Sequence, residues 1–316
     1  MTTVSNKHSI SERYHLKPSK GFLTLLYNSI KTIFTIMKTI IHATDFSKNA
    51  ATALKYAHVL CRKLKARLRI IHVYDSTTMS SDLSETYFLP KKELSKKKND
   101  TLKEYCISIL GDDFKKTKID IESIENTSVI KGIIEKAIKL NASIIITGMK
   151  GRNALADFFI GSTTKQLIEK APCPVLAVPH NSVLKNIKTI VYASDFEEED
   201  ISAISELADI AKVFNARIKI VHISSENEKN GQNEMEWFKE MVEQHLNYKA
   251  LEFEIYNSDD IFNFLKIYLE EIEADMVAML EREKRSLGKK LFHTDLVKKM
   301  EQQSLIPLIS FNETNY

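Results

Sequence analysis

A glycine-bearing loop near the middle of the chain has the residue types that hold phosphate groups. It contains Gly148, Gly151 and Gly161, and Ser162 and Thr163 follow directly. Glycines after a strand let backbone N–H groups approach phosphate oxygens with no side chain between them. A helix that opens at Ser162 would add free amides, a favourable dipole and hydroxyl donors. The combination predicts a phosphate cradle, although each residue taken singly is equally a turn glycine or a helix cap.

Patterns for other chemistry are weaker. His42 and His72 fall in or beside expected buried strands, where histidine is more often structural than catalytic. The sequence has no G-x-S-x-G elbow, Walker A motif, G-x-G-x-x-G motif or zinc-ligand spacing. Asp45 is the one obvious acid expected near the cradle, and a single carboxylate does not define a general base. No catalytic residue and no metal ligand is therefore predicted.

Strands alternate with helices around this loop. The expected strands begin at Ile40 and continue with residues 68–74, 119–124, 143–147 and 174–178, and the expected helices cover 48–64 (capped by Ser47), 91–110, 129–140 and 162–170. This alternation predicts an α/β fold with a parallel sheet covered on both faces. Ligands bind such sheets beyond the carboxyl ends of the strands, where the glycine loop is expected.

The same arrangement recurs at an offset of 150 residues. Residues 40–46 (I-I-H-A-T-D-F) reappear as 190–196 (I-V-Y-A-S-D-F), and residues 66–73 reappear as 216–223. Both segments align without a gap, which indicates a duplication. The second copy is expected to have strands at 190–193, 218–223, 251–256, 275–280 and 308–311, and helices at 201–214, 234–246, 261–271 and 294–301. The predicted domains are 38–180 and 186–316, after a leader at 1–37.

Charge and composition limit the classes of function. Hydrophobic residues make up 43% and charged residues 28% of the chain, as in globular proteins. The whole chain has a net charge of +3. Its first 36 residues carry five basic side chains and one acidic one, so the remaining residues are together nearly neutral. Acidic residues 197–200 are interpreted as solvated decoration. No nucleic-acid partner is predicted.

The leader and the cysteines favour a cytoplasmic protein. The apolar stretch at 22–37 is interrupted and too short to span a membrane, and it lacks a signal-peptide cleavage site. A misassigned start is the first interpretation of the leader, and an amphipathic membrane-surface helix is the alternative. Cys61, Cys106 and Cys173 are widely spaced, which indicates buried thiols in a reducing compartment and not a disulfide framework.

The glycine pattern G-x2-G-x9-G-S/T, together with the opening I-I-H-A-T-D-F-S and the I-I-H-V strand ending, resembles the universal stress protein family. The resemblance covers residues 38–316. It implies two tandem Rossmann-like domains of the adenine nucleotide alpha hydrolase type, each with a five-stranded parallel sheet of order 3-2-1-4-5 and helices on both faces. It also implies that strands 174–178 and 308–311 join the copies into an intramolecular pseudo-dimer. A further homo-oligomer and a protein partner are left open.

In the family's ATP-binding branch, the matching positions form an adenine nucleotide site. The resemblance implies that Asp45 and Ala43 lie at the nucleoside end and that the backbone of Val73 contacts adenine, although the family often has proline at the position of Ala43. The residues that would contact the ribose and the phosphates, with Mg²⁺ bridging the phosphates as one alternative, are Thr147, Gly148, Gly151, Gly161, Ser162 and Thr163.

The second copy departs from this pattern. The alignment puts Leu280, Glu283 and His293 at the positions of the three glycines, in that order, while Asp195 and Thr294 keep the family's residue types. Leucine and glutamate would block and repel phosphate, so this copy is predicted to bind no nucleotide.

Three functions follow as hypotheses. The first is a stress-response regulator whose state depends on ATP bound to the first copy. The alternatives are a slow ATPase or phosphotransferase, and a nucleotide-independent interaction protein.

Overall fold

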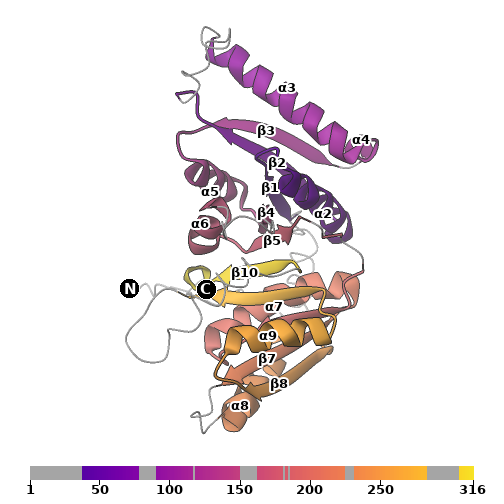
Figure 1. The fold of residues 1–316 in the computed structure, drawn as a ribbon, viewed down its shortest axis with the longest axis vertical. Coiled ribbons are helices and arrows are strands. Elements are labelled where there is room, and N and C mark those ends of the chain that lie inside the picture. The colour runs from indigo at the N-terminus through magenta and orange to yellow at the C-terminus, as the bar shows by residue number, and fades with distance from the viewer. Residues whose placement is uncertain are drawn as a thin grey trace, which may run out of the picture. The chain divides into compact units, whose positions relative to one another are not determined.

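The computed structural model describes residues 38–77, 90–116, 118–149, 162–180, 182–183, 186–224, 231–282 and 306–316. Ten strands form one sheet in the order β3-β2-β1-β4-β5-β10-β9-β6-β7-β8. The first five positions have the predicted order 3-2-1-4-5, and the other five have the same order when read from the far edge of the sheet. Figure 1 shows the two halves in indigo to rose and in salmon to yellow.

The first half alternates strands and helices as the sequence predicts. Its strands are β1 (Thr39–Ala43), β2 (Arg67–Tyr74), β3 (Ile119–Glu125), β4 (Ile144–Met149) and β5 (Val175–Pro179). Its helices are α2 (Lys48–Leu64), α3 (Lys91–Leu110), α4 (Asp113–Lys116), α5 (Val129–Leu140) and α6 (Ser162–Lys170). Ser47 caps α2, with its Oγ accepting a hydrogen bond from the Ala50 N–H at 3.2 Å.

The second half repeats the series. Its strands are β6 (Thr189–Ala193), β7 (Arg217–Ser224), β8 (Leu251–Asn257), β9 (Met276–Glu281) and β10 (Leu308–Asn312). Its helices are α7 (Glu198–Phe214), α8 (Gly231–His245) and α9 (Ile261–Glu271), and a short 3-10 turn, η3 (Glu313–Asn315), follows β10. The helix predicted at 294–301 lies outside the described residues, as do the leader at 1–37 and the boundary residues Asn181, Leu184 and Lys185.

The last strands of the two halves join them. β10 pairs with β5 in antiparallel register, with Leu308 opposite Ala177 and Ser310 opposite Val175, and Figure 1 shows the two strands side by side. The remaining strand pairs are parallel, from β1–β2 to β7–β8. The predicted pairing of these two terminal strands is confirmed.

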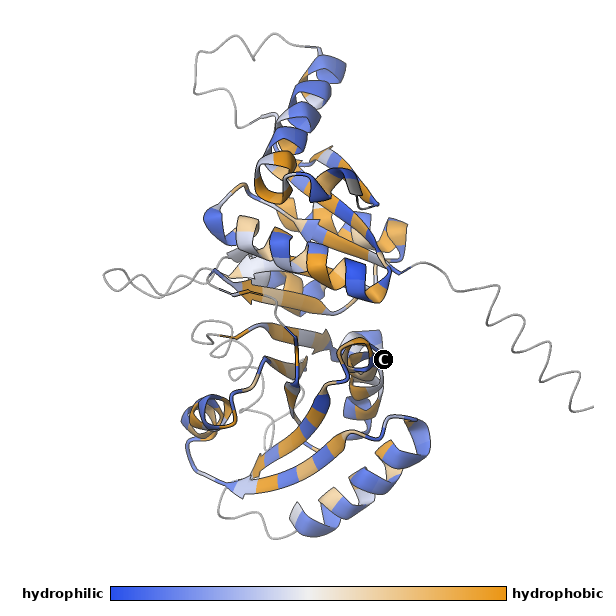
Figure 2. Ribbon diagram, turned by 90° about the vertical axis from the view of Figure 1, so that its right-hand side faces the viewer, coloured by the Kyte–Doolittle hydropathy of each residue, from blue (hydrophilic) through white to orange (hydrophobic). Residues whose placement is uncertain are grey.

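Two apolar layers cover the sheet and run through both halves. One contains buried residues of α2, α3, α7 and α8, and the other contains those of α5, α6 and α9. The outermost strands, β3 and β8, alternate acidic and apolar residues and are only partly buried. Figure 2 shows this alternation of blue and orange along the outer strands of the lower half. The central strands are covered on both faces, which is why they are continuous apolar runs, whereas the outer strands are only partly covered.

α7 begins earlier than predicted. The apolar pattern placed its start at Ile201, whereas the helix begins at Glu198 and its first turn holds Glu198, Glu199 and Asp200. The interpretation of residues 197–200 as solvated decoration is wrong, because the Asp200 side chain is buried at 1% exposure.

Candidate functional site

A cavity of about 230 Å³ lies at the carboxyl edge of the first-half sheet. Its walls come from the ends of β1, β2 and β4 and from the first turns of α2, α5 and α6. β1 and β4 are neighbours, yet the helices that follow them cover opposite faces of the sheet. This is the switch point at which open α/β sheets bind ligands.

Most of the predicted site residues meet in this cavity. Ala43, Asp45, Val73, Thr147, Gly148, Ser162 and Thr163 line it. The remaining two, Gly151 and Gly161, lie outside the described residues, as do the loop cations Lys150 and Arg152. Residues separated by more than one hundred positions in the sequence thus converge because parallel strands end at a common edge.

The turn after β1 holds Asp45 in place. The Asp45 carboxylate accepts a hydrogen bond from the Ser47 N–H at 3.0 Å, and the Thr44 hydroxyl accepts one from the Phe46 N–H at 3.1 Å. Phe46 has a left-handed backbone with φ of 63°, which non-glycine residues seldom adopt. Asp45 lines the cavity, and in the described part of the chain no cation forms an ion pair with its carboxylate.

His72 fixes the same turn from the neighbouring strand. Its Nδ1 lies 2.9 Å from the Thr44 carbonyl oxygen, to which it donates, and its ring lies 4.3 Å from that of Phe46. Burial lowers the pKa of His72, which favours the neutral ring. The second half repeats this device: His222 Nδ1 lies 2.8 Å from the Ser194 carbonyl oxygen and the ring stacks on Phe196. Repetition in both halves indicates a structural role for this histidine, as the sequence favoured.

Gly148 is required by packing as well as by any ligand. A Cβ at this position would lie 2.5 Å from the carbonyl carbon of Asn49 and 2.9 Å from the nitrogen of Ala50. These are backbone atoms of α2, which cannot move away without shifting the helix. The absence of a side chain therefore lets α2 pack against β4, a requirement that no local sequence pattern indicates.

The start of α6 is tied to the end of β4. The buried Thr164 hydroxyl lies 3.4 Å from that of Thr147 and 3.5 Å from the Gly148 carbonyl oxygen, to which it donates. This leaves Ser162 exposed and Thr163 partly exposed at the rim of the cavity. Their hydroxyls are available to a ligand.

The three helices that begin at the cavity carry no acidic residue in their first turns. Side-chain caps satisfy only one amide each in α2 and α5, through Ser47 and Ser128. The positive ends of three helix dipoles thus face one hollow, whose lining includes a single acid, Asp45. Such an arrangement favours an anionic ligand.

The second half fills the equivalent position with its own side chains. Arg282 directly follows β9 and is 4% exposed, and its guanidinium lies 2.9 Å from Glu197, 3.1 Å from Asp200, and 3.6 Å from both Asp195 and Glu199. At the 150-residue offset these four acids correspond to Asp45, Ser47, Asn49 and Ala50, all of which line the first-half cavity. In the second half, Arg282 and its four acids therefore lie at the positions whose counterparts line the cavity in the first half.

Hydrogen bonds complete this internal network. Asp200 accepts hydrogen bonds from the Tyr192 hydroxyl at 2.7 Å and the Ser194 hydroxyl at 2.8 Å. Burial raises the pKa of Asp200 and the Arg282 guanidinium opposes that rise. Burial works against the charge of Arg282, but Asp200, Glu197 and Asp195 outweigh it and raise the Arg282 pKa. Leu280, predicted together with Glu283 to block the site, lies buried in the core, and Glu283 lies outside the described residues. Arg282 was not predicted to take part.

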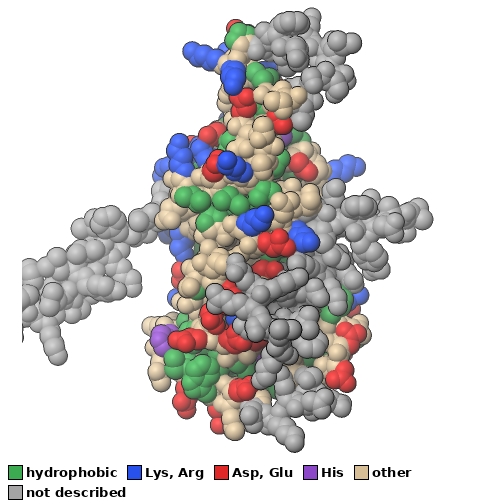
Figure 3. Space-filling view, turned by 90° about the vertical axis from the view of Figure 1, so that its left-hand side faces the viewer, with side chains coloured by type: hydrophobic (Ala, Val, Ile, Leu, Met, Phe, Trp, Pro, Cys, Tyr) green, Lys and Arg blue, Asp and Glu red, His purple; other side chains and the backbone are tan. Residues whose placement is uncertain are grey.

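The near-neutral charge of the folded body conceals two opposite halves. Residues 38–180 contain 24 Lys and Arg against 15 Asp and Glu, while residues 181–316 contain 16 against 26. Figure 3 shows this on one face, where blue side chains gather in the upper part and red ones in the lower part. The half with the cavity is therefore the basic one. Counting charges by copy would have revealed this from the sequence.

No described helix combines the length and the apolar character needed to cross a membrane. Within the same residues, no group of three or more His, Cys, Asp and Glu side chains is arranged to hold a metal ion. All three cysteines are buried thiols without disulfide bonds.

Sheet order, internal repeat and cavity define a tandem α/β protein with a cavity at the carboxyl edge of its first half. The sequence pattern of the universal stress protein family matches residues 37–179. A Staphylococcus aureus (strain USA300) protein described as a universal stress protein is 32% identical over 145 residues, which are 45% of this chain and 83% of that protein. The chain therefore belongs to the universal stress protein family.

Further relatives extend the comparison. A Staphylococcus saprophyticus protein of the same description is 28% identical over 167 residues, 51% of this chain and 95% of that protein. The crystal structure of a universal stress protein from Archaeoglobus fulgidus has a TM-score of 0.68 at 18% identity and covers 88% of this chain and 99% of its own. A second, from Pseudomonas aeruginosa, has a TM-score of 0.56 at 13% identity, with 88% and 94% covered. These structures share the fold through both halves.

Proposed function

We propose that the first half binds ATP in the cavity at its carboxyl edge and that the protein is a nucleotide-dependent regulator of a stress response. The observation that carries this proposal is the convergence of seven predicted site residues on one hollow. We further propose that residues 38–180 and 186–316 are the two domains, and that only the first takes up nucleotide. Membership of the universal stress protein family supports the link to stress.

The lining suits the two ends of a nucleotide. Val73 and the exposed Val129 supply apolar surface for a base. The hydroxyls of Ser162 and Thr163 and the positive ends of α2, α5 and α6 supply donors and positive potential for phosphates. The basic charge of the first half adds long-range attraction for a polyanion. The residues present therefore fit ATP.

Each residue has a proposed part in binding. Asp45 and Ala43 would lie at the nucleoside end and the Val73 backbone at adenine. Thr147, Gly148, Gly151, Gly161, Ser162 and Thr163 would lie at the ribose and phosphates. A Mg²⁺ ion bound together with ATP would neutralise phosphate charge. The protein's contribution is to bind and orient the nucleotide, and we assign no catalytic step to its residues. The buried free thiols suit a reducing compartment, so we propose the cytoplasm as the location.

Calorimetry of the full chain with ATP and Mg²⁺ tests the proposal. We expect saturable binding of one ATP per chain. Ser162→Glu puts a negative charge at the start of α6 and should weaken ATP binding at least tenfold. Gln166→Glu adds the same charge one turn later on the same helix, outside the cavity, and should change the affinity by less than twofold.

The fate of the nucleotide separates the alternatives. ATP recovered unchanged by mass spectrometry supports a binding protein, whereas many turnovers to ADP would indicate a slow ATPase. If the folded chain takes up no ATP, the nucleotide-independent interaction protein replaces our proposal. Equal weakening in both glutamate variants would show that ATP binds elsewhere on the basic half.

A further inference from the structure

Helix α6, whose first residues line the cavity at the carboxyl edge, is short and has a low helical propensity at its start. It has 9 residues and opens with Ser162, Thr163 and Thr164. Serine and threonine are poor helix formers, and a helix of fewer than about 12 residues is marginal on its own. The position of α6 beside the cavity therefore depends on its contacts with the rest of the protein.

The amino end and the middle of α6 are held by the first half itself. The Thr164 hydroxyl donates to the Gly148 carbonyl oxygen, and Leu167 and Ile168 are buried in the apolar layer that α5 also joins. In the last turn, the Leu167 carbonyl oxygen accepts a hydrogen bond from the Ala171 N–H at 2.8 Å. A helix cannot satisfy its last four carbonyl oxygens internally, so those that follow Leu167 need donors from elsewhere.

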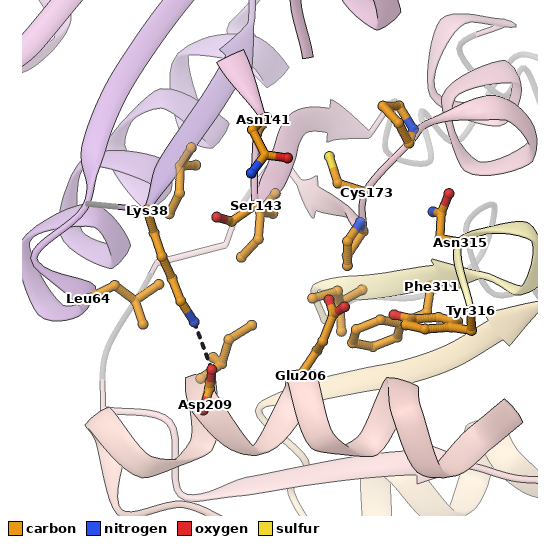
Figure 4. A pocket seen from close by; sticks show the side chains of 17 residues that line it. Lys38, Leu64, Asn141, Ser143, Cys173, Glu206, Asp209, Phe311, Asn315 and Tyr316 are labelled. Carbon is orange, nitrogen blue, oxygen red and sulfur yellow. Dashed lines mark hydrogen bonds and ion pairs between the residues drawn. The ribbon is translucent and has the colours of Figure 1, made fainter. Parts of the chain in front are cut away.

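The second half supplies these donors. The side-chain amide of Asn312, the last residue of β10, donates to the carbonyl oxygens of Ile168 at 3.2 Å and Glu169 at 2.9 Å. The Asn315 amide donates to the Ala171 carbonyl oxygen at 3.1 Å. Figure 4 shows Asn315 on the yellow segment after β10, directed toward the first half. Residues 143 or 144 positions away thus cap the carboxyl end of α6.

The Asn312 side chain is fixed in this orientation. It is 5% exposed, and its Oδ1 accepts hydrogen bonds from the Thr314 N–H at 2.9 Å and from the Thr314 hydroxyl at 2.6 Å. Because two donors engage that oxygen, the amide nitrogen is the group that faces α6. Rotation of the amide would leave buried polar atoms without partners, which is unfavourable. Asn312 is therefore a rigid link between β10 and α6.

The equivalent position in the first half cannot make the same contact. The fifth residue of β5 is Pro179, whereas the fifth residue of β10 is Asn312. Proline has no side-chain donor. The second half, which we propose takes up no nucleotide, thus supplies a contact that the first half does not return through this position.

We propose that Asn312 is a positioning residue for the phosphate end of the nucleotide site, so that the second half sets the affinity of the first half for ATP. This inference rests on the proposed function. Asn312 fixes the carboxyl end of α6, and the short helix transmits that restraint to Ser162 and Thr163 at its other end. Because the helix is already in place, ATP need not order it, and such pre-organisation increases affinity. By reciprocity, bound ATP strengthens the contact between α6 and the second half.

Calorimetry of the full chain with ATP and with adenosine tests this inference. Adenosine lacks the phosphates and does not reach α6 in the proposed site. We expect Asn312→Ala to weaken ATP binding at least fivefold and to change adenosine binding by less than twofold. The matched control is Ser310→Ala, because Ser310 is a buried residue of the same strand whose hydroxyl donates to the Phe311 carbonyl oxygen at 3.5 Å and not to α6. This control should leave both affinities within twofold.

Hydrogen–deuterium exchange of the nucleotide-free chain measures the restraint on α6 itself. The amides of α6 should exchange faster in Asn312→Ala than in the wild-type chain, and Ser310→Ala should match the wild type. Asn315→Ala removes one donor from an exposed residue, so it disturbs the core less. It should weaken ATP binding about twofold to threefold, again with adenosine binding unchanged.

The outcomes separate this inference from the proposed function. Unchanged ATP affinity, or unchanged exchange of α6, in a folded Asn312→Ala chain would overturn the inference and leave the proposed function intact. Equal weakening of ATP and adenosine would also overturn it, because that result indicates a general loss of structure. A wild-type chain that binds no ATP would remove both. If Asn312→Ala does not fold, the same criteria apply to Asn315→Ala.

Discussion

The two halves have the same strand order but opposite arrangements at the carboxyl edges of β1 and β6. In the first half the edge is a cavity beside three helix starts without acids. In the second half the acids of α7 surround the buried Arg282. A duplicated fold can thus keep its framework while one copy replaces an external ligand with an internal ion-pair network.

The framework that both halves retain is specific. His72 and His222 each donate to the turn after the first strand and pack against the ring of a phenylalanine with a left-handed backbone, Phe46 or Phe196. The turn is therefore preserved by contacts that do not depend on a ligand. What changed is the charge placed around it.

Removal of the internal cation should have the largest effect. Arg282→Met would leave four acids around an apolar side chain, and breaking a buried pair in this way costs about 3–5 kcal/mol. Urea unfolding of the full chain measures the loss. Lys38→Met breaks the half-exposed pair with Asp209 and should cost less than about 1 kcal/mol. If the two variants were equally stable, Arg282 would not hold the second half together.

A methyl group at Gly148 tests the packing of β4 against α2. Gly148→Ala would press a Cβ into the backbone of Asn49, and overpacking of this kind costs about 1–3 kcal/mol. The matched control is Gly231→Ala, because a Cβ there would meet nothing closer than 3.8 Å. Thermal unfolding should therefore distinguish the two alanine variants. A stable Gly148→Ala protein would leave ligand contact as the reason for this glycine.

A smaller, pH-dependent difference should come from His42, which corresponds to Tyr192. Burial lowers the pKa of His42 to about 4, even though its Nδ1 donates to the Ile146 carbonyl oxygen at 3.2 Å. The unfolded chain takes up a proton near pH 6.5 and the folded chain does not. Stability is therefore full above that pH and falls as the pH drops toward 4.

His42→Gln removes this titration and retains a donor for the carbonyl. Between pH 7 and pH 5 the wild-type chain should lose about 1–2 kcal/mol more than the variant in urea unfolding. His180→Gln, at an exposed position, should follow the wild-type curve. A His42→Gln curve that matched the wild type would mean that His42 is not the group responsible.

The local pattern of the sequence was sufficient for most of the fold. Helices α3, α5, α6 and α9 have their predicted limits, because apolar periodicity and caps such as Ser128 act within a few residues. The duplication gave the second half the same series of elements. The meeting of Asp45 and Ser162 at the carboxyl edge of the first half was also predictable, because β1 and β4 are neighbours in the predicted strand order.

Long-range contacts explain why other features could not be predicted from the sequence. Residues 197–200 look like a solvated acidic run until Arg282, more than eighty positions later, is folded onto them. The close approach of Asn49 to Gly148 joins residues about one hundred positions apart. Neither contact is indicated by a local sequence pattern. Only the opposite net charges of the two halves follow directly from the sequence.

The antiparallel union of β5 and β10 has a consequence for how copies of the chain can meet. The edge of each strand is hydrogen-bonded to the other strand. Neither edge therefore offers unpaired backbone groups to which a strand of another chain could bond. In the described residues the sheet ends at β3 and β8, whose acidic side chains alternate along the strand. Pairing of such an edge with another sheet would bury these charged groups, which disfavours end-to-end growth of a long, continuous sheet into fibres.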